Sequence, residues 1–168
     1  MILNLIILRI RPSRSAKLYA SVWSEGGSPL MVHCKAQTAG VKKILDEKFN
    51  DDVPVALGMS YGNPSMESAI AELTAQNVHN ITVLPLYPQY SGATIGSTFD
   101  AVAKVFTKTR WVPELHFIGG YQQSEAYIDA LCETIRKQFD EHGEPDKLVF
   151  SYHGTPQSYL KKGDPYHC

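Results

Sequence analysis

The stretch that decides the fold is residues 53–86, VPVALGMSYGNPSMESAIAELTAQNVHNITVLPL. It begins with a short apolar run at 53–60, which is typical of a buried strand, and it ends with a second such run at 80–86. Between them, Asn63 offers an N-cap and Pro64 a proline at the first helical position. Apolar residues then recur at helical spacing as far as Gln76, namely Met66, Ala69, Ile70 and Leu73. The stretch therefore predicts a strand, a helix and a second strand.

The same alternation extends in both directions from this stretch. The further elements expected are helices over 13–23, 35–49 and 94–107, a strand over 114–118, a helix capped by Ser124 and stopped by Gly143, and a strand over 147–152. Strands that alternate with helices are typical of a parallel sheet covered by helices on both faces. We therefore predict a doubly wound, three-layer α/β fold, with residues 1–168 forming a single domain.

Polar and aromatic residues follow each of the four predicted strands. Parallel sheets bind ligands at the carboxyl ends of their strands. The segments expected at those ends are Ser60-Tyr61-Gly62, Tyr87–Ser91, Gly119-Gly120-Tyr121 and Ser151–Gly154. We predict that Tyr61, Tyr87 and His153 share this edge and that the edge is the functional site.

His153 is the histidine best placed for chemistry. It directly follows a predicted strand and precedes the small Gly154, so its ring would project from the sheet edge. An imidazole there suits proton transfer or metal ligation. The alternative is a histidine that only caps the strand end through a backbone hydrogen bond. His116 falls inside a predicted strand, where a structural role is expected.

The segment Tyr87–Ser91, YPQYS, has two interpretations. It is either an ordinary loop whose tyrosines cover the sheet edge, or a surface for a flat aromatic ligand with polar substituents. The segment Gly26–Pro29 is by default a helix stop followed by a turn. The sequence contains no phosphate-binding glycine loop and no G-x-S-x-G element, so nucleotide binding and serine hydrolysis are not favoured.

Composition narrows the choice of partners and compartment. The 16 Lys plus Arg nearly balance the 17 Asp plus Glu, so no strong positive field attracts nucleic acid. Cys34, Cys132 and Cys168 are odd in number and lack metal-binding spacing, which favours a reducing compartment over a disulfide framework. The apolar opening, 1–10, is too short to span a bilayer, and its positive charges follow the apolar run rather than precede it, unlike a signal peptide. We expect a cytoplasmic protein, with peripheral membrane contact left open.

Four separate motifs together resemble the ferrochelatase family, and its bacterial type most closely. They are RSAKLYASVWSEGGSPL at 14–30, LGMSYGNPS at 57–65, VLPLYPQYS at 83–91 and LVFSYHGTPQSYLKKGDPY at 148–166. The S-Y-H-G-x-P element followed by G-D-P-Y is the most specific of them, and the resemblance covers essentially the whole chain. It implies a chelatase-like fold of two similar lobes. It also implies the insertion of ferrous iron into protoporphyrin IX to give protohaem, the last step of haem biosynthesis.

The resemblance also implies roles for particular residues. His153 matches the family's active-site histidine, a metal ligand or proton acceptor. Ser60, Tyr61, Tyr87, Tyr90 and Ser91 match segments that line the porphyrin cleft, and Ser28 matches a loop near the porphyrin's edge.

The chain departs from the family pattern in two respects. The family's catalytic glutamate lies in a second lobe that these residues do not include, and its first strand, ahead of the helix at Ser13, is missing. Both ends of the chain look cut, so we expect an incomplete cleft and an inactive fragment. Some members hold an iron–sulfur cluster through a cysteine beside the YPQYS segment. Gly92 and Ala93 stand there in this chain, so no cluster and no prosthetic group are expected.

Two alternatives remain at this stage. One is a chelatase for another tetrapyrrole or metal, such as cobalt, which would share the fold and the cleft histidine. The other is a non-catalytic porphyrin-binding module of flavodoxin-like type.

Overall fold

The centre of the structure is a pair of parallel strands joined through a helix. The structure is a computed structural model and describes residues 8–168. Strand β1 (Asn80–Val83) pairs with β2 (Glu114–Phe117), with Ile81 opposite Leu115 and Val83 opposite Phe117. The connection runs through a π-helical turn, η2 (Gly92–Gly96), and helix α4 (Ser97–Phe106). The strands predicted at 80–86 and 114–118 and the helix predicted at 94–107 are therefore confirmed.

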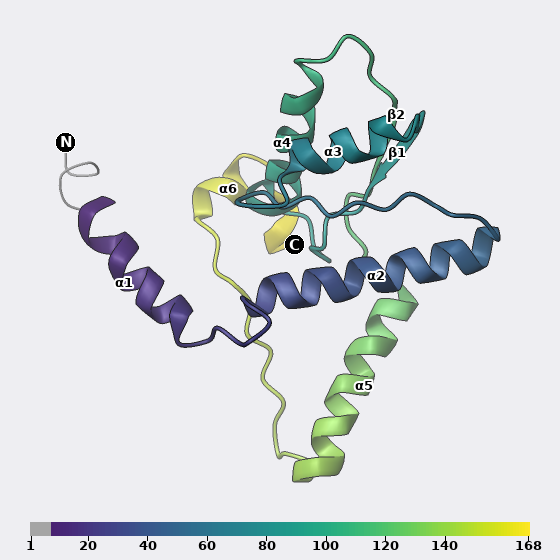
Figure 1. Cartoon of the computed structure of the whole chain (residues 1–168). Coiled ribbons are helices and arrows are strands. Elements are labelled where there is room, and N and C mark those ends of the chain that lie inside the picture. The colour runs from purple at the N-terminus through teal and green to yellow at the C-terminus, as the bar shows by residue number, and fades with distance from the viewer. Residues whose placement is uncertain (1–7) are drawn as a thin grey trace.

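The hydrophobic core lies between this strand pair and two helices. Helix α3 (Met66–Ala75) packs on α4, and both contribute to one cluster with the strands. Its buried members are Ile70, Ile81, Val102 and Phe106. In Figure 1, α3, α4, β1 and β2 gather at one end of the molecule, whereas α1 (Leu8–Ala20) and α5 (Glu125–His142) extend away from it.

Among the described residues the two-stranded sheet is covered by helices on one face, so the three-layer part of the prediction is not confirmed. Side chains alternate along both strands: Ile81 and Val83 face the core, while Asn80 and Thr82 are exposed. In β2, Glu114 and His116 are likewise exposed. Such alternation is typical of a sheet with one solvated face. The described residues therefore form an α/β unit of two layers, helices over a small parallel sheet.

Two of the four predicted strands do not form. The run at 53–60 is mostly half-buried, and its β pairing among the described residues is a single bridge between Met59 and Ser65. The run at 147–152 is exposed throughout, and Val149 retains 83% of its accessible surface. A strand buried on both faces needs a helix layer on each. Helix α5 has no buried residue, and α2 (Pro29–Phe49) buries only Cys34, so neither supplies that layer.

Three helices, α1, α2 and α3, begin at other residues than the sequence predicts. For α2 and α3 the reason is the residue that caps the helix. Ser65 rather than Asn63 caps α3, because its hydroxyl accepts a hydrogen bond from Ser68 N at 3.1 Å. Ser28 caps α2, and Pro29 occupies its first position, so this helix begins before residue 35. Helix α1 runs from Leu8 to Ala20 instead of from 13 to 23.

The far end of the chain agrees better with expectation. Helix α5 starts after Ser124 and ends at His142, and Gly143 follows it at a positive φ of 84°, so the predicted glycine stop is confirmed. A short helix, α6 (Gln157–Lys161), and a 3₁₀ turn, η3 (Pro165–His167), close the chain.

The molecule exposes more surface than a closed globule of its mass. Its accessible surface is 13447 Å², against about 8,300 Å² expected for a folded monomer of 18.7 kDa. Large apolar side chains contribute to the excess, among them Leu30 and Phe49 on α2 and Ile128 on α5. None of the helices in residues 8–168 combines the length and hydropathy that crossing a bilayer requires. The apolar opening at 1–10 lies largely outside the described residues.

A matched pair of substitutions tests where the core lies. Ile70→Ala in α3 removes a side chain that is 6% exposed, so the free energy of unfolding should fall by about 2–5 kcal/mol. Ile128→Ala in α5 makes the same change at a side chain that is 44% exposed and should cost under about 0.5 kcal/mol. Urea unfolding followed by circular dichroism measures both. Equal losses would show that α5 is packed in solution as tightly as α3.

Candidate functional site

Two loops meet where the parallel strands end. Tyr87–Ser91 follows β1, Gly119–Tyr121 follows β2, and the Tyr121 N–H donates to the Pro88 carbonyl at 2.9 Å. Gly120 makes this approach possible, since a Cβ there would lie 3.1 Å from the Pro88 oxygen and its φ is +150°. The prediction that these two strand ends share one edge is confirmed.

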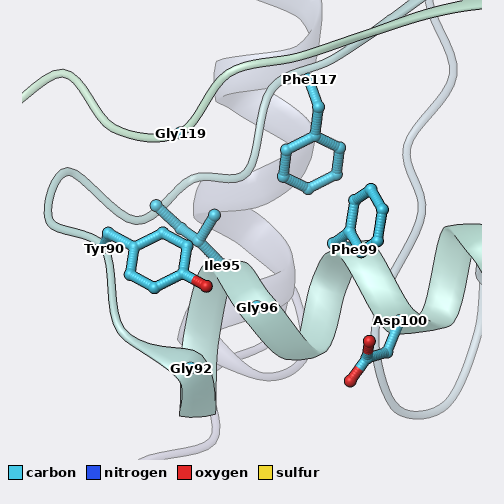
Figure 2. Close-up of a pocket in the computed structure, with 8 residues that line it drawn as sticks. All are labelled: Tyr90, Gly92, Ile95, Gly96, Phe99, Asp100, Phe117 and Gly119. Atoms are coloured by element: carbon cyan, nitrogen blue, oxygen red, sulfur yellow. The ribbon is translucent and has the colours of Figure 1, made fainter. Parts of the chain in front are cut away.

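An aromatic pocket lies beside this junction. The cavity has a volume of about 400 Å³ and is lined by Tyr90, Gly92, Ile95, Gly96, Phe99, Asp100, Phe117 and Gly119. Figure 2 shows the rings of Phe99 and Phe117 together on one side and Tyr90 on the other. The two phenylalanine rings meet edge to face, with their centroids 5.4 Å apart. Flat apolar walls, one phenol hydroxyl and one carboxylate suit a planar aromatic ligand with polar substituents.

A second cavity, here called the C-terminal hollow, adjoins the first. It has a volume of about 380 Å³ and is lined by Tyr90, Gly92, Ala93, Tyr159, Lys162, Gly163 and Asp164. Tyr90 and Gly92 line both cavities. Gly96 allows the placement of Tyr90, because a Cβ there would lie 3.2 Å from the Tyr90 hydroxyl. The YPQYS loop therefore borders the aromatic pocket and the chain's C-terminal segment at once.

A hydrogen-bond cluster around Asp164 joins that segment to the loop. Asp164 Oδ2 accepts from Gly92 N at 2.8 Å and from Ser91 Oγ at 3.1 Å, while Oδ1 accepts from Tyr166 N at 3.0 Å. These donors stabilise the charged carboxylate. The Tyr166 N–H, followed by the Gly92 N–H, therefore holds the pKa of Asp164 below its ordinary value. Ser91 is buried, with 2% of its surface exposed.

Sequence reasoning missed Asp164 as a site residue. The G-D-P-Y element signals a turn, since aspartate before proline readily caps a following helical turn, as Asp164 does for η3. Nothing in the sequence indicates that this turn packs on a loop more than 70 residues earlier. Only the fold shows that juxtaposition.

The other predicted site residues do not converge. Only Tyr87 of the three edge residues follows a strand of the sheet, because the runs before Tyr61 and His153 are not paired in it. Tyr61 is 91% exposed, and His153 lies exposed in the extended segment between α5 and α6. Ser60 is exposed beside Tyr61, and Ser28 serves as the α2 cap, accepting from Met31 N at 3.2 Å. The prediction that Tyr61, Tyr87 and His153 share one strand-end edge is therefore wrong for this structure.

The side chains that could bind a metal ion are scattered over the described residues. Within residues 8–168, His, Cys, Asp and Glu form no group of three that could hold a metal ion. His116 lies in β2 with Nε2 3.3 Å from Glu114 Oε1, on the exposed face of the sheet. The three cysteines are free, and Cys34 alone is buried.

Fold and site together define an α/β protein with an aromatic pocket at the carboxyl ends of parallel strands. The family model described as Ferrochelatase matches residues 1–168, and the chain belongs to that family. The resemblance carried by the four sequence motifs is therefore confirmed, and with it a chelatase-like α/β fold.

Curated relatives named ferrochelatase agree with this assignment. The one from Pseudoalteromonas atlantica is 51% identical over 168 residues, which cover all of this chain and 47% of the relative. The one from Thioalkalivibrio sulfidiphilus is 52% identical over 168 residues, covering 46% of the relative. The one from Escherichia coli is 51% identical over 165 residues, which cover 97% of this chain and 50% of the relative. The chain spans about half the length of the curated relatives it matches.

The Asp164 cluster should give a defined pH dependence. A carboxyl whose pKa is lowered by folding contributes stability above its unfolded pKa and loses it as pH falls through the folded value. The stability difference between the unchanged chain and Asp164→Asn should therefore be full above about pH 4 and shrink at lower pH. Lys162, Tyr90 and Tyr159 line the same hollow, and none of them is a carboxylic acid.

Urea unfolding of both chains between pH 3 and pH 7 measures this difference. Asp146→Asn, which removes an exposed carboxylate from the loop after α5, is the control and should show no such trend. A difference that grows as the pH falls would contradict the assigned sign.

Proposed function

We propose that this chain contributes to the insertion of ferrous iron into protoporphyrin IX, the reaction that gives protohaem. The observation that carries the proposal is the family match over all 168 residues, together with relatives about half identical to the chain that are named ferrochelatase. Ferrous iron is a substrate in this scheme rather than a resident cofactor. We propose no iron–sulfur cluster, because Gly92 and Ala93 stand where a cluster cysteine would be expected. We further propose that the protein works in the cytoplasm.

The reaction makes three physical demands. Two pyrrole protons must leave, the iron must lose water, and the macrocycle must bend so that its nitrogen lone pairs can reach the metal. A neutral histidine can accept a proton or bind a partly dehydrated ferrous ion. We assign that role to His153, which lies exposed in an extended segment and so has its ring accessible to a ligand.

Bending the ring uses binding energy from contacts remote from the metal. We propose that the YPQYS loop supplies part of this surface through Tyr87, Tyr90 and Ser91. Both tyrosines are more than a third exposed, and Tyr90 also lines the aromatic pocket. Ser28, Ser60 and Tyr61 are proposed as further porphyrin contacts, on the family resemblance alone.

His153 should be essential in a complete enzyme. We suggest a chimera in which this chain replaces the matched half of the Escherichia coli relative. His153→Ala should lower iron insertion by at least ~10²-fold, as expected for a lost proton acceptor. Its protoporphyrin affinity should stay within about tenfold, roughly 1.4 kcal/mol. Fluorometric loss of protoporphyrin measures insertion, and absorbance titration measures affinity.

His116→Ala is the matched control for that experiment. His116 lies on the exposed face of β2, so its removal should leave iron insertion within about twofold, the effect of a change away from the site. If the His153 variant kept more than about a tenth of the activity, well short of the loss expected of an acid–base group, the histidine would be a structural residue and the assigned mechanism would be wrong.

The 168 residues alone should bind protoporphyrin weakly and insert little iron. The chain spans half the length of its relatives, and its candidate contacts are largely exposed. Absorbance titration with protoporphyrin, followed by an insertion assay with ferrous and cobaltous ions, measures both properties. Rapid iron insertion would overturn the expectation of weak catalysis, and a preference for cobalt would favour the other chelatase class. Tight binding without insertion by the chimera would favour a porphyrin-binding module.

A further inference from the structure

The Asp164 carboxylate makes the longest-range side-chain contacts of the described chain. Among the side-chain hydrogen bonds of residues 8–168, its bonds to Ser91 Oγ and Gly92 N are the only two that join residues more than ten positions apart. The other side-chain hydrogen bonds in this part of the chain join residues ten or fewer positions apart, as in the caps of α2 and α3 and the bond from Lys42 to Asp52. The contact between the C-terminal segment and the βαβ unit therefore depends heavily on one carboxylate.

The two oxygens of Asp164 have different partners. Oδ1 accepts from Tyr166 N and shapes the turn that begins η3, while Oδ2 accepts from Ser91 and Gly92. Ser91 Oγ in turn accepts from Ala93 N at 3.3 Å, at the start of η2. The carboxylate thus connects the C-terminal turn to the start of the helix that follows the YPQYS loop.

The packing leaves little freedom at this junction. A Cβ on Gly92 would lie 3.3 Å from Asp164 Oδ2, so the glycine lets the carboxylate reach the backbone. Tyr90, two residues before Gly92, lines both the aromatic pocket and the C-terminal hollow. Any shift of the loop at Ser91 and Gly92 therefore moves Tyr90, whose side chain lines both cavities.

We propose that Asp164 is a positioning residue, whose carboxylate fixes the YPQYS loop so that Tyr90 presents its ring to a planar ligand in the aromatic pocket. Asp164 itself does not touch the ligand. The inference rests on the proposed function only for the identity of that ligand, protoporphyrin.

The chemistry requires a carboxylate rather than an amide. Three donors converge on the two oxygens, and asparagine offers only one acceptor oxygen. In Asp164→Asn the amide NH₂ must face either the Tyr166 N–H or the Ser91 and Gly92 donors. One side of the junction is then lost whichever way the amide turns.

The test uses the 168-residue chain and its Asp164→Asn variant. Hydrogen exchange by NMR should show the Gly92 amide exchanging at least about tenfold faster in the variant, as expected when a hydrogen bond to a charged group is lost. The core amides of Ile81 and Val102 should exchange within about twofold of the unchanged chain, since a positioning role does not weaken the core. Protoporphyrin affinity, by absorbance titration, should fall about fivefold or more.

Two companion variants complete the test. Asp146→Asn removes the same charge from an exposed loop and should change neither the Gly92 exchange nor the affinity. Ser91→Ala removes one of the three donors, and its effect on affinity should be less than additive with Asp164→Asn because the two residues share one contact.

The results distinguish the positioning role of Asp164 from the proposed function of the chain. An unchanged Gly92 amide in Asp164→Asn, or a changed amide with unchanged porphyrin affinity, would overturn the positioning role and leave the proposed function standing. Faster exchange at Ile81 and Val102 in parallel with Gly92 would also overturn it, because the residue would then be acting on the whole fold. Absence of protoporphyrin binding both by the unchanged chain and by the chimera that carries it would overturn the proposed function and the ligand assignment together.

Discussion

The parallel pairing of β1 with β2 is the constraint on which the rest of the structure depends. Parallel neighbours cannot be joined by a tight turn, so the chain between Val83 and Glu114 must cross the sheet. Helix α4 makes that crossing and buries Val102 and Phe106 against the strands. Because both strands run the same way, the loops that leave them meet at one edge. The aromatic pocket and the contact between Tyr121 and Pro88 are consequences of this arrangement.

The sequence predicts correctly those elements whose own apolar residues are enough to bury one face. Helix α4 and strands β1 and β2 carry enough apolar residues to bury one face without help from elsewhere. The run at 147–152 looks equally strand-like, but a strand needs neighbours for its backbone groups and cover for its faces. A local sequence pattern does not show whether neighbouring strands and covering helices are present. The prediction of a strand at 147–152 is therefore wrong. The alternation of Ile81 with Thr82 in the sequence is itself typical of a strand with one solvated face.

The residues of the candidate site also differ in how far they could be predicted from the sequence. Tyr90 and Ser91 could be selected from the sequence because they lie in the loop that follows a strand that does form. His153 was selected by the same rule after a strand that does not form, so its role rests on the family resemblance instead. Asp164 could not be found at all, since its partners are 72 and 73 residues away. Glycines are a shared feature of this junction. A Cβ at Gly92, Gly96 or Gly120 would lie only 3.1–3.3 Å from an atom of the loop or of its partner, Asp164.

A two-stranded sheet leaves an unpaired row of backbone donors and acceptors along each of its outer sides. Here those rows lie in the same chain as the exposed, apolar and strand-prone run at 148–150. Such a run can add to an open row of its own molecule or of another, and dilution favours the first outcome while crowding favours the second. The colloidal behaviour of the purified chain is therefore coupled to its concentration, with charged side chains such as Lys147 and Asp146 beside the run opposing self-association.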